Sequence, residues 1–334
     1  MLKRAAFSLA LGALGLACSS SNPPATSCAT DAQSPDVGAS EAGPDDDSVA
    51  AESGPPDSAA GPFIKTVFVI LMENKSIAQL ATNTAAPYIS QRLFSISASA
   101  SQYYNPPRNH PSEPNYIWLE AGDSLGIGDD NDPSFHTLTT PDHLTAYLDK
   151  AGIAWKSYQE DIDGSVCPLT QIAQYGPKHD PFVFFSDVTG HNNPADPYCI
   201  AHIRPFTEFE PDLARGTVAR YNFITPNLCN DMHDCAVQVG DAWLETTLSS
   251  ITASPVYQDG GAIFVTWDEA DGGDGPIGMF VLSPHAKAGY SNAIHYDHSS
   301  LVKTVQEIFG VMPLLHHAGD PGVNDLSDLF STFP

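Results

Sequence analysis

Basic residues are scarce in this sequence. Its 334 residues include 14 lysines and arginines against 40 aspartates and glutamates, so the formal net charge is -26 at pH 7. A protein that binds nucleic acid, or that docks on anionic lipid through charge, needs a basic surface. The composition therefore argues against nucleic acid as a partner and against electrostatic docking on a membrane. It does not exclude a phosphate-bearing substrate, because a bound cation can reverse the local charge.

Long apolar runs are also missing. No apolar run reaches the roughly 18 residues that a membrane-spanning helix requires, which argues against an integral membrane protein. A shorter run over residues 5–17 follows Lys3 and Arg4, as in a secretion signal, which we place at residues 1–18. Cys18 comes directly after Gly15-Leu16-Ala17, a sequence that resembles a bacterial lipobox. We expect export, with a lipid anchor on Cys18 at the outer membrane or cell surface, or else ordinary cleavage and secretion.

Residues 19–61 lack lysine, arginine, histidine, leucine and aromatic residues altogether. They contain nine serines, nine alanines, six prolines and eight acidic residues. Such a segment cannot bury enough apolar area to offset its chain entropy. The sequence therefore predicts a disordered acidic tether at 19–61 and a single folded domain at 62–334.

Cys-x-x-Cys spacing is absent, so a zinc cluster is the weaker interpretation of the four cysteines in the domain. Export makes disulfides the stronger interpretation. Four cysteines allow three pairings. We favour the local pair Cys229–Cys235 together with Cys167–Cys199.

Strand-like and helical patterns alternate along the domain. Continuous apolar, β-branched runs at 65–72 and 261–267 are typical of strands buried on both faces. Further strands are predicted at 99–104, 153–159, 218–225 and 277–283. Helices are predicted at 86–97, 115–122, 141–152, 236–253 and 299–309, and residues 160–215 have weak periodicity. This alternation predicts an α/β fold with a largely parallel central sheet sandwiched by helices.

Polar clusters follow three of these strands directly. Glu73-Asn74 follows the first strand, Asp268-Glu269 follows the strand at 261–267, and residues 227–235, which include Asp231, follow the strand at 218–225. In a parallel sheet these strand ends share one edge, where ligands of open α/β sheets bind. Acidic clusters brought together there indicate a divalent cation site. Helix caps and solvated loop acids are the alternative.

Ser112 lies between two prolines before a predicted helix. It is either the N-cap of that helix or a nucleophile. Histidines occur in the same polar segments, namely His110, His179, His233 and His298. Single histidines are usually structural or exposed, but four of them near one edge favour phosphate contact, metal ligation or protonation of a leaving group.

Several segments together resemble a known family: FVILMEN, HPSEPNY, KHDPFVFF, ITPNLCNDMHD, TWDEADG and YDHSSLVKTVQEIFG. In this order they resemble the phosphoesterase family of bacterial acid phosphatases and phospholipases C, within the alkaline-phosphatase-like superfamily. The resemblance runs from about residue 64 to 312. It points in particular to the small secreted acid phosphatases of the mycobacterial type, which can act on phosphoinositides.

The resemblance implies a role for each candidate residue. Ser112 matches the nucleophile, and His179 and His110 match phosphate contacts. His298 or His233 would protonate the leaving alcohol, and Asp231 would bind a second ion or orient His233. A divalent metal ion would be held by the remaining candidates together with the nucleophile, namely Glu73, Asn74, Ser112, Asp268 and Glu269.

The expected function is therefore that of a metal-dependent acid phosphatase working through a phosphoserine. Its partner would be a phosphate monoester, which includes phosphoinositides and other phospholipids, and it would meet the membrane only through a lipid anchor on Cys18. One alternative is a phosphodiesterase of the phospholipase C type. The other is an inactive surface binding protein on a phosphatase fold.

Overall fold

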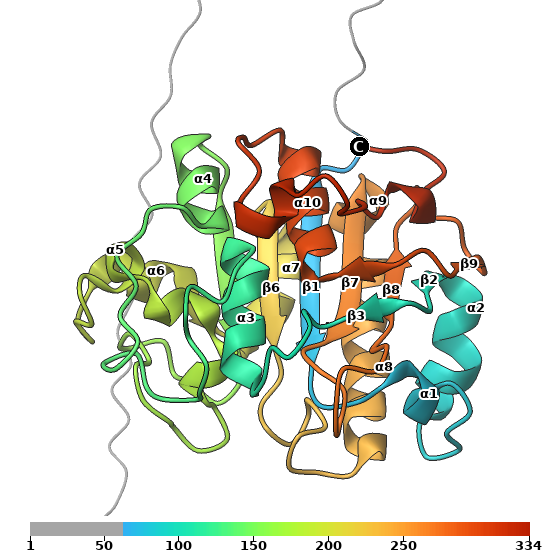
Figure 1. Ribbon diagram of the computed structural model, residues 1–334, viewed down its shortest axis with the longest axis horizontal. Helices are drawn as coiled ribbons and strands as arrows, with labels where there is room; N and C mark the ends of the chain where they lie inside the picture. Colours follow the sequence, from blue (N-terminus) through green and yellow to red (C-terminus); the bar gives the residue numbers. More distant parts are fainter. Residues whose placement is uncertain (1–62) are drawn as a thin grey trace, which may run out of the picture. The chain divides into compact units, whose positions relative to one another are not determined.

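The computed structural model describes residues 63–334. These residues form a central eight-stranded sheet (Figure 1). The predicted secretion signal, lipid anchor and tether lie outside the described residues. The strand order is β5-β4-β6-β1-β7-β8-β2-β9, and β10 and β3 form a separate two-stranded sheet. The strands are β1 (Thr66–Met72), β2 (Ala98–Ala100), β3 (Tyr103–Tyr104), β4 (Trp155–Gln159), β5 (Ile203–Pro205), β6 (Tyr221–Thr225), β7 (Gly261–Trp267), β8 (Met279–Leu282), β9 (Ser291–Asn292) and β10 (Tyr296–Asp297).

The large sheet is mostly parallel, as predicted. β1 lies at its centre and pairs in parallel with β6 on one side and β7 on the other. β8 pairs antiparallel with both of its neighbours, β7 and β2. Every residue of β1 and β7 is buried, which explains why both read as unbroken apolar runs.

Helices cover both faces of this sheet. Figure 1 shows α3 and α10 on one face and α8 on the other. In α8, the buried residues Leu244, Leu248 and Ile251 recur at helical spacing and so form one packed stripe. The α-helices are α1 (Ile77–Leu80), α2 (Phe94–Ile96), α3 (Ser112–Ala121), α4 (Leu144–Lys150), α5 (Ser186–Thr189), α6 (Pro197–His202), α7 (Phe209–Arg215), α8 (Val237–Ala253), α9 (Pro255–Gln258) and α10 (His298–Phe309).

One π-helix and several 3-10 helices complete the secondary structure of the described residues. One π-helical turn, η1 (Tyr88–Leu93), leads into α2, so the predicted helix at 86–97 is real but irregular. Residues 160–215, which have weak periodicity in the sequence, form several short helices and the strand β5. β5 is an edge strand of the large sheet. The 3-10 helices are η2 (Pro177–His179), η3 (Pro181–Phe184), η4 (Phe206–Glu208), η5 (His316–Gly319) and η6 (Ser327–Leu329).

Several predicted elements differ in their limits, and two of these differences change the topology or the position of a candidate site residue. The strand predicted at 99–104 is two short strands, β2 and β3, which belong to different sheets. Helix α3 begins at Ser112 rather than at residue 115, so the candidate nucleophile lies in its first turn. Pro114 does not prevent this earlier start, because the first-turn amides of a helix have no helical partner.

Both favoured disulfides are confirmed. Cys167 is bonded to Cys199 and Cys229 to Cys235. Disulfides of this kind are typical of proteins in oxidising compartments. Within residues 63–334, no helix is long and apolar enough to cross a membrane.

Candidate active site

The acidic segments that follow β1, β6 and β7 meet at one edge of the sheet. The backbone amide of Glu73 donates to the Asp231 carbonyl over 2.9 Å, and the amide of Asp268 donates to the Met72 carbonyl over 2.9 Å. These bonds hold the three acidic residues beside one another. The prediction that these strand ends come together is confirmed.

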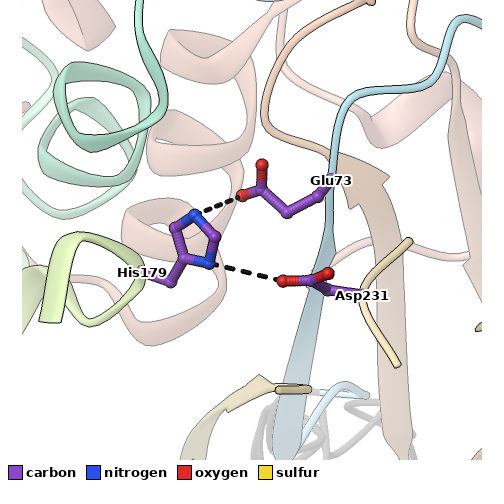
Figure 2. A group of neighbouring side chains, drawn as sticks. All are labelled: Glu73, His179 and Asp231. Atoms are coloured by element: carbon purple, nitrogen blue, oxygen red, sulfur yellow. Dashed lines mark ion pairs between the residues drawn. The ribbon is translucent and has the colours of Figure 1, made fainter. Parts of the chain in front are cut away.

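His179 lies between two buried carboxylates (Figure 2). Its Nε2 is 3.2 Å from Glu73 Oε1, and its Nδ1 is 3.3 Å from Asp231 Oδ2. The imidazole also stacks on the ring of Tyr116 from α3, with the centroids 4.8 Å apart. Three elements therefore fix this group, namely β1 through Glu73, η2 through His179 and the loop after β6 through Asp231.

The donor atoms of this group fit a divalent cation. Ligand atoms of Glu73, His179 and Asp231 all lie within 4.8 Å of one another. Glu73 Oε1, Asp231 Oδ2, Asp268 Oδ2 and His179 Nε2 are buried without a hydrogen-bond partner. Buried polar atoms without partners are costly, so four of them at one place point to a ligand that satisfies them. Carboxylate oxygens and an imidazole nitrogen are donors that borderline and hard divalent ions accept.

The electrostatics point the same way. Burial raises the pKa of Glu73 well above its usual value, and the charges of Asp268 and Asp231 raise it further. Burial also raises the pKa of Asp268, and it raises the pKa of Asp231 to about 7. Burial, followed by the charge of Lys178, lowers the pKa of His179 to about 3. Without a cation these carboxyls repel one another, and a bound cation would favour their ionised forms.

Ser112, the candidate nucleophile, lies beside this group. Its Oγ donates a hydrogen bond to Glu73 Oε2 over 3.1 Å, and the side chain is buried in the first turn of α3. Asn74 completes the contact, because its Nδ2 is 3.2 Å from the same Glu73 oxygen and its backbone amide donates to Asp268 Oδ1 over 3.0 Å. The turn that allows both bonds places Asn74 in the left-handed region, at φ 52°.

Glu269 faces a second set of partners. Its Oε2 accepts from Asn115 Nδ2 over 3.2 Å and is also paired with His110 Nδ1. His110 Nε2 in turn lies 2.8 Å from Asp274 Oδ1, so the imidazole is held between two carboxylates. Burial and the charge of Asp268 raise the pKa of Glu269 to about 7. Glu269, the residue after Asp268, therefore has its orientation set by His110 and Asn115.

The two histidines predicted to protonate the leaving group are placed very differently. His298 is fully buried; its Nε2 is 2.7 Å from the Asp268 carbonyl and its Nδ1 is 3.1 Å from the Tyr103 hydroxyl. Burial lowers its pKa to about 4, and both of its ring nitrogens have polar partners. His233 instead has a side chain that is 29% exposed. His298 therefore contacts the Asp268 backbone, whereas His233 contacts Asp234 Oδ1 through Nδ1 and lies 3.4 Å from Lys178 Nζ through Nε2.

Three residues of this site were not assigned from the sequence. Asn115 holds Glu269, while Lys178 and Asp130 form an ion pair of 3.1 Å near Ser112. Asn115 lies in the HPSEPNY segment and Lys178 directly precedes His179. Their closeness in sequence to candidate site residues could therefore have indicated both of them. Asp130 lies in a loop and carries no local signal.

Comparisons with known proteins agree with this geometry. Residues 89–312 match the model of a protein family that is described as "Phosphoesterase family". The chain is 29% identical over 271 residues to a phosphatidylinositol-3-phosphatase of Mycobacterium tuberculosis, a match that covers 80% of this chain and 85% of that protein. It is 30% identical over 217 residues to a phosphate-repressible acid phosphatase of Penicillium chrysogenum, a match that covers 62% of this chain and 51% of that longer protein.

A solved structure shares the fold. A protein in the alkaline phosphatase superfamily from Vibrio parahaemolyticus matches with a TM-score of 0.52 at 9% identity, covering 77% of this chain and 70% of its own. At this identity the likeness concerns the fold alone. The predicted alkaline-phosphatase-like fold is confirmed.

Proposed function

Because this chain belongs to the phosphoesterase family and is thus a phosphoric ester hydrolase, we propose that it is a metal-dependent acid phosphatase acting on phosphate monoesters. The observation that carries this proposal is the placement of Ser112. Its hydroxyl lies in the first turn of α3, 3.1 Å from a Glu73 oxygen. It also lies beside four buried atoms that could bind a metal ion and that have no hydrogen-bond partner. A nucleophile next to a cation site is the arrangement that a phosphoserine mechanism requires.

The cation would be held first by the group in Figure 2, namely Glu73, His179 and Asp231. The family resemblance adds Asn74, Asp268, Glu269 and Ser112 as candidate ligands. When bound, a divalent ion would polarise the phosphoryl group and offset the negative charge of the phosphate. Asp268 Oδ2 is the further orphaned oxygen that would be satisfied in this way.

The protein's own residues supply the nucleophile and its orientation. Glu73 Oε2 accepts a hydrogen bond from the Ser112 hydroxyl, which directs the oxygen lone pairs away from the carboxylate. Glu73 would take this proton as the oxygen attacks. Helix α3 has ten residues, and the positive end of its dipole favours an anion close to Ser112. The Ser112 oxygen would form a bond to phosphorus as the bond to the leaving oxygen breaks, in line with the attack.

His233 is the proposed proton donor in that step. Its Nδ1 is 2.7 Å from Asp234 Oδ1, which orients this partly exposed ring. With Nδ1 held by Asp234, the proton would pass from Nε2 to the leaving oxygen, once Lys178 Nζ has turned from Nε2 to a phosphoryl oxygen. Water would then cleave the phosphoserine, with the same imidazole taking a proton from the water.

We also propose where the protein acts. The two relatives named above are called a phosphatidylinositol-3-phosphatase and an acid phosphatase, so the proposed substrates are phosphate monoesters, including those on lipid headgroups. The two disulfides and the signal-like residues 1–18 support export. A lipid anchor on Cys18 and a dispensable tether over residues 19–61 remain part of the same proposal.

A substrate panel tests the function. Turnover of p-nitrophenyl phosphate, bis-p-nitrophenyl phosphate and phosphatidylcholine would be measured with several divalent ions. The proposal expects hydrolysis of the monoester at a rate well above that of both diesters. Preference for either diester would instead indicate a phospholipase C-type phosphodiesterase, and failure to cleave any of them would indicate a binding protein.

A further inference from the structure

A partly exposed lysine ammonium lies between Asp130 and His233, beside the buried acidic site. Lys178 Nζ is 3.1 Å from Asp130 Oδ2 and 3.4 Å from His233 Nε2, and its side chain is 22% exposed. An ammonium carries three donors, so these two contacts leave one donor available to a further partner. Lys75, the neighbouring cation after Asn74, differs because its Nζ donates to two backbone carbonyls of the loops.

Asp130 connects this ammonium to the nucleophile. Its Oδ2 accepts from Lys178 Nζ, and its Oδ1 accepts over 3.0 Å from the backbone amide of Glu113, the residue after Ser112. One carboxylate therefore bridges Lys178 and the first turn of α3. The charge on Lys178 is thereby tied to the helix turn that carries Ser112.

We propose that Lys178 is a substrate-binding residue that donates to the phosphoryl oxygens, and that Asp130 is the residue that positions it. This inference rests on the proposed phosphatase function. The site is rich in acids, with Glu73, Asp231 and Asp268 buried side by side, and these acids repel an incoming phosphate dianion. A lysine is a compact point charge that binds phosphate well, and beside the acidic site it would draw the anion toward Ser112.

The chain offers a matched control for the test. Lys65 Nζ is 2.7 Å from Asp259 Oδ1, so it too is paired with an aspartate, but both side chains are more than half exposed. Lys65 directly precedes β1, whereas Glu73 directly follows that strand, so this pair lies at the opposite edge of the sheet. The change of Lys65→Gln removes the same charge as Lys178→Gln without touching the site.

The experiment measures the affinity for inorganic phosphate by titration calorimetry on the metal-loaded protein, and KM and kcat with p-nitrophenyl phosphate. Lys178→Gln should weaken phosphate binding and raise KM by about tenfold to a hundredfold, as expected for loss of a charge-assisted hydrogen bond, with a smaller change in kcat. Lys178→Arg should recover most of the affinity because it keeps the charge. Lys65→Gln should match the wild-type protein in both measurements.

The outcomes separate this inference from the proposed function. Unchanged phosphate affinity and KM in a folded Lys178→Gln variant, while the wild-type protein hydrolyses the monoester, would overturn the role of Lys178 alone. Phosphate binding that depends on Lys178 in a protein without turnover would support Lys178 and overturn the phosphatase. Melting curves establish folding, and Lys178→Met provides a second uncharged variant if the glutamine variant is unstable.

Discussion

The Ser112 hydroxyl donates to Glu73 Oε2 over 3.1 Å, although 39 residues separate the two in the sequence. The contact joins the first turn of α3 to the carboxyl end of the central strand β1. It places the candidate nucleophile against the carboxylate that also faces His179. Nucleophile and cation site thus share one residue, and loss of either should disturb the other.

Removing the nucleophile should abolish turnover and leave the fold intact. We expect Ser112→Ala to lower kcat by at least about a thousandfold, as removal of an essential nucleophile does in other hydrolases. The melting temperature should change little, because the substitution deletes a single hydroxyl. Ser95→Ala is the control, since Ser95 is exposed on α2 away from the site. Wild-type turnover in Ser112→Ala would refute the assignment.

Removing the cation should abolish activity and lower stability. A chelator should reduce turnover to background and lower the melting temperature, because an ion that binds only the folded state stabilises it. Adding a divalent ion should restore both properties. Glu73→Gln or Asp231→Asn should weaken metal affinity by at least about tenfold, measured by calorimetry. Asp259→Asn, at the exposed pair with Lys65, should bind the ion normally, and full activity in metal-free protein would contradict the proposal.

His143 should give the protein a pH-dependent stability. Its Nδ1 is 2.8 Å from Glu120 Oε1 and its Nε2 is 3.0 Å from Asp187 Oδ2, which ties α3 to α4 and α5. Burial by itself lowers the pKa of His143, but the hydrogen bonds to Asp187 and Glu120 outweigh it and raise the pKa to about 9. Because the unfolded value is about 6.5, the stabilisation is complete below pH 6.5 and is lost as pH rises through about 9.

The variant His143→Gln tests this window. Its melting temperature should fall below that of the wild-type protein by about 5 °C or more at pH 6, as for loss of a buried charged partner. The difference should shrink between pH 6.5 and 9. His191→Gln, an exposed histidine, should show no such trend. A difference that is constant with pH would mean that His143 is neutral in the folded protein.

The two disulfides should have separable effects. Cys167–Cys199 closes a separation of 32 residues and Cys229–Cys235 one of 6, so chain entropy assigns them about 4 and about 2 kcal/mol of stability. The shorter bridge encloses Asp231 and His233. Replacing both of its cysteines by serine should therefore weaken metal binding and turnover strongly and lower the melting temperature only a little. Loss of the longer bridge should lower the melting temperature strongly and leave metal binding and turnover nearly unchanged. Equal effects of the two losses on melting temperature and on metal binding would contradict this prediction.

The sequence predicted the centre of the fold because the buried strands are unusually uniform. All residues of β1 and β7 are apolar or have short side chains and all are buried, so their pattern left little ambiguity. The acidic edge followed from the same strands, since parallel neighbours place their carboxyl ends together. The position of Glu73, Asp231 and Asp268 could thus be predicted without knowledge of side-chain geometry.

Other parts of the site depend on contacts that no local pattern reveals. Asp130 and Lys178 are 48 residues apart, and Asp130 lies in a loop, so their ion pair follows only from the tertiary structure. His298 was predicted to reach the substrate, but as the first residue of α10 it packs inward with both ring nitrogens engaged. Which way a polar residue at a helix end faces is decided by its neighbours in space.

The most direct test of the central claim is to trap the covalent intermediate. The metal-loaded protein would be mixed with p-nitrophenyl phosphate, quenched in acid within the first turnovers, digested and analysed by mass spectrometry. We predict one phosphoryl group on the peptide that contains Ser112, and its absence from Ser112→Ala treated in the same way. Phosphate on a different residue, or rapid turnover with no phosphorylated peptide at any quench time, would contradict it.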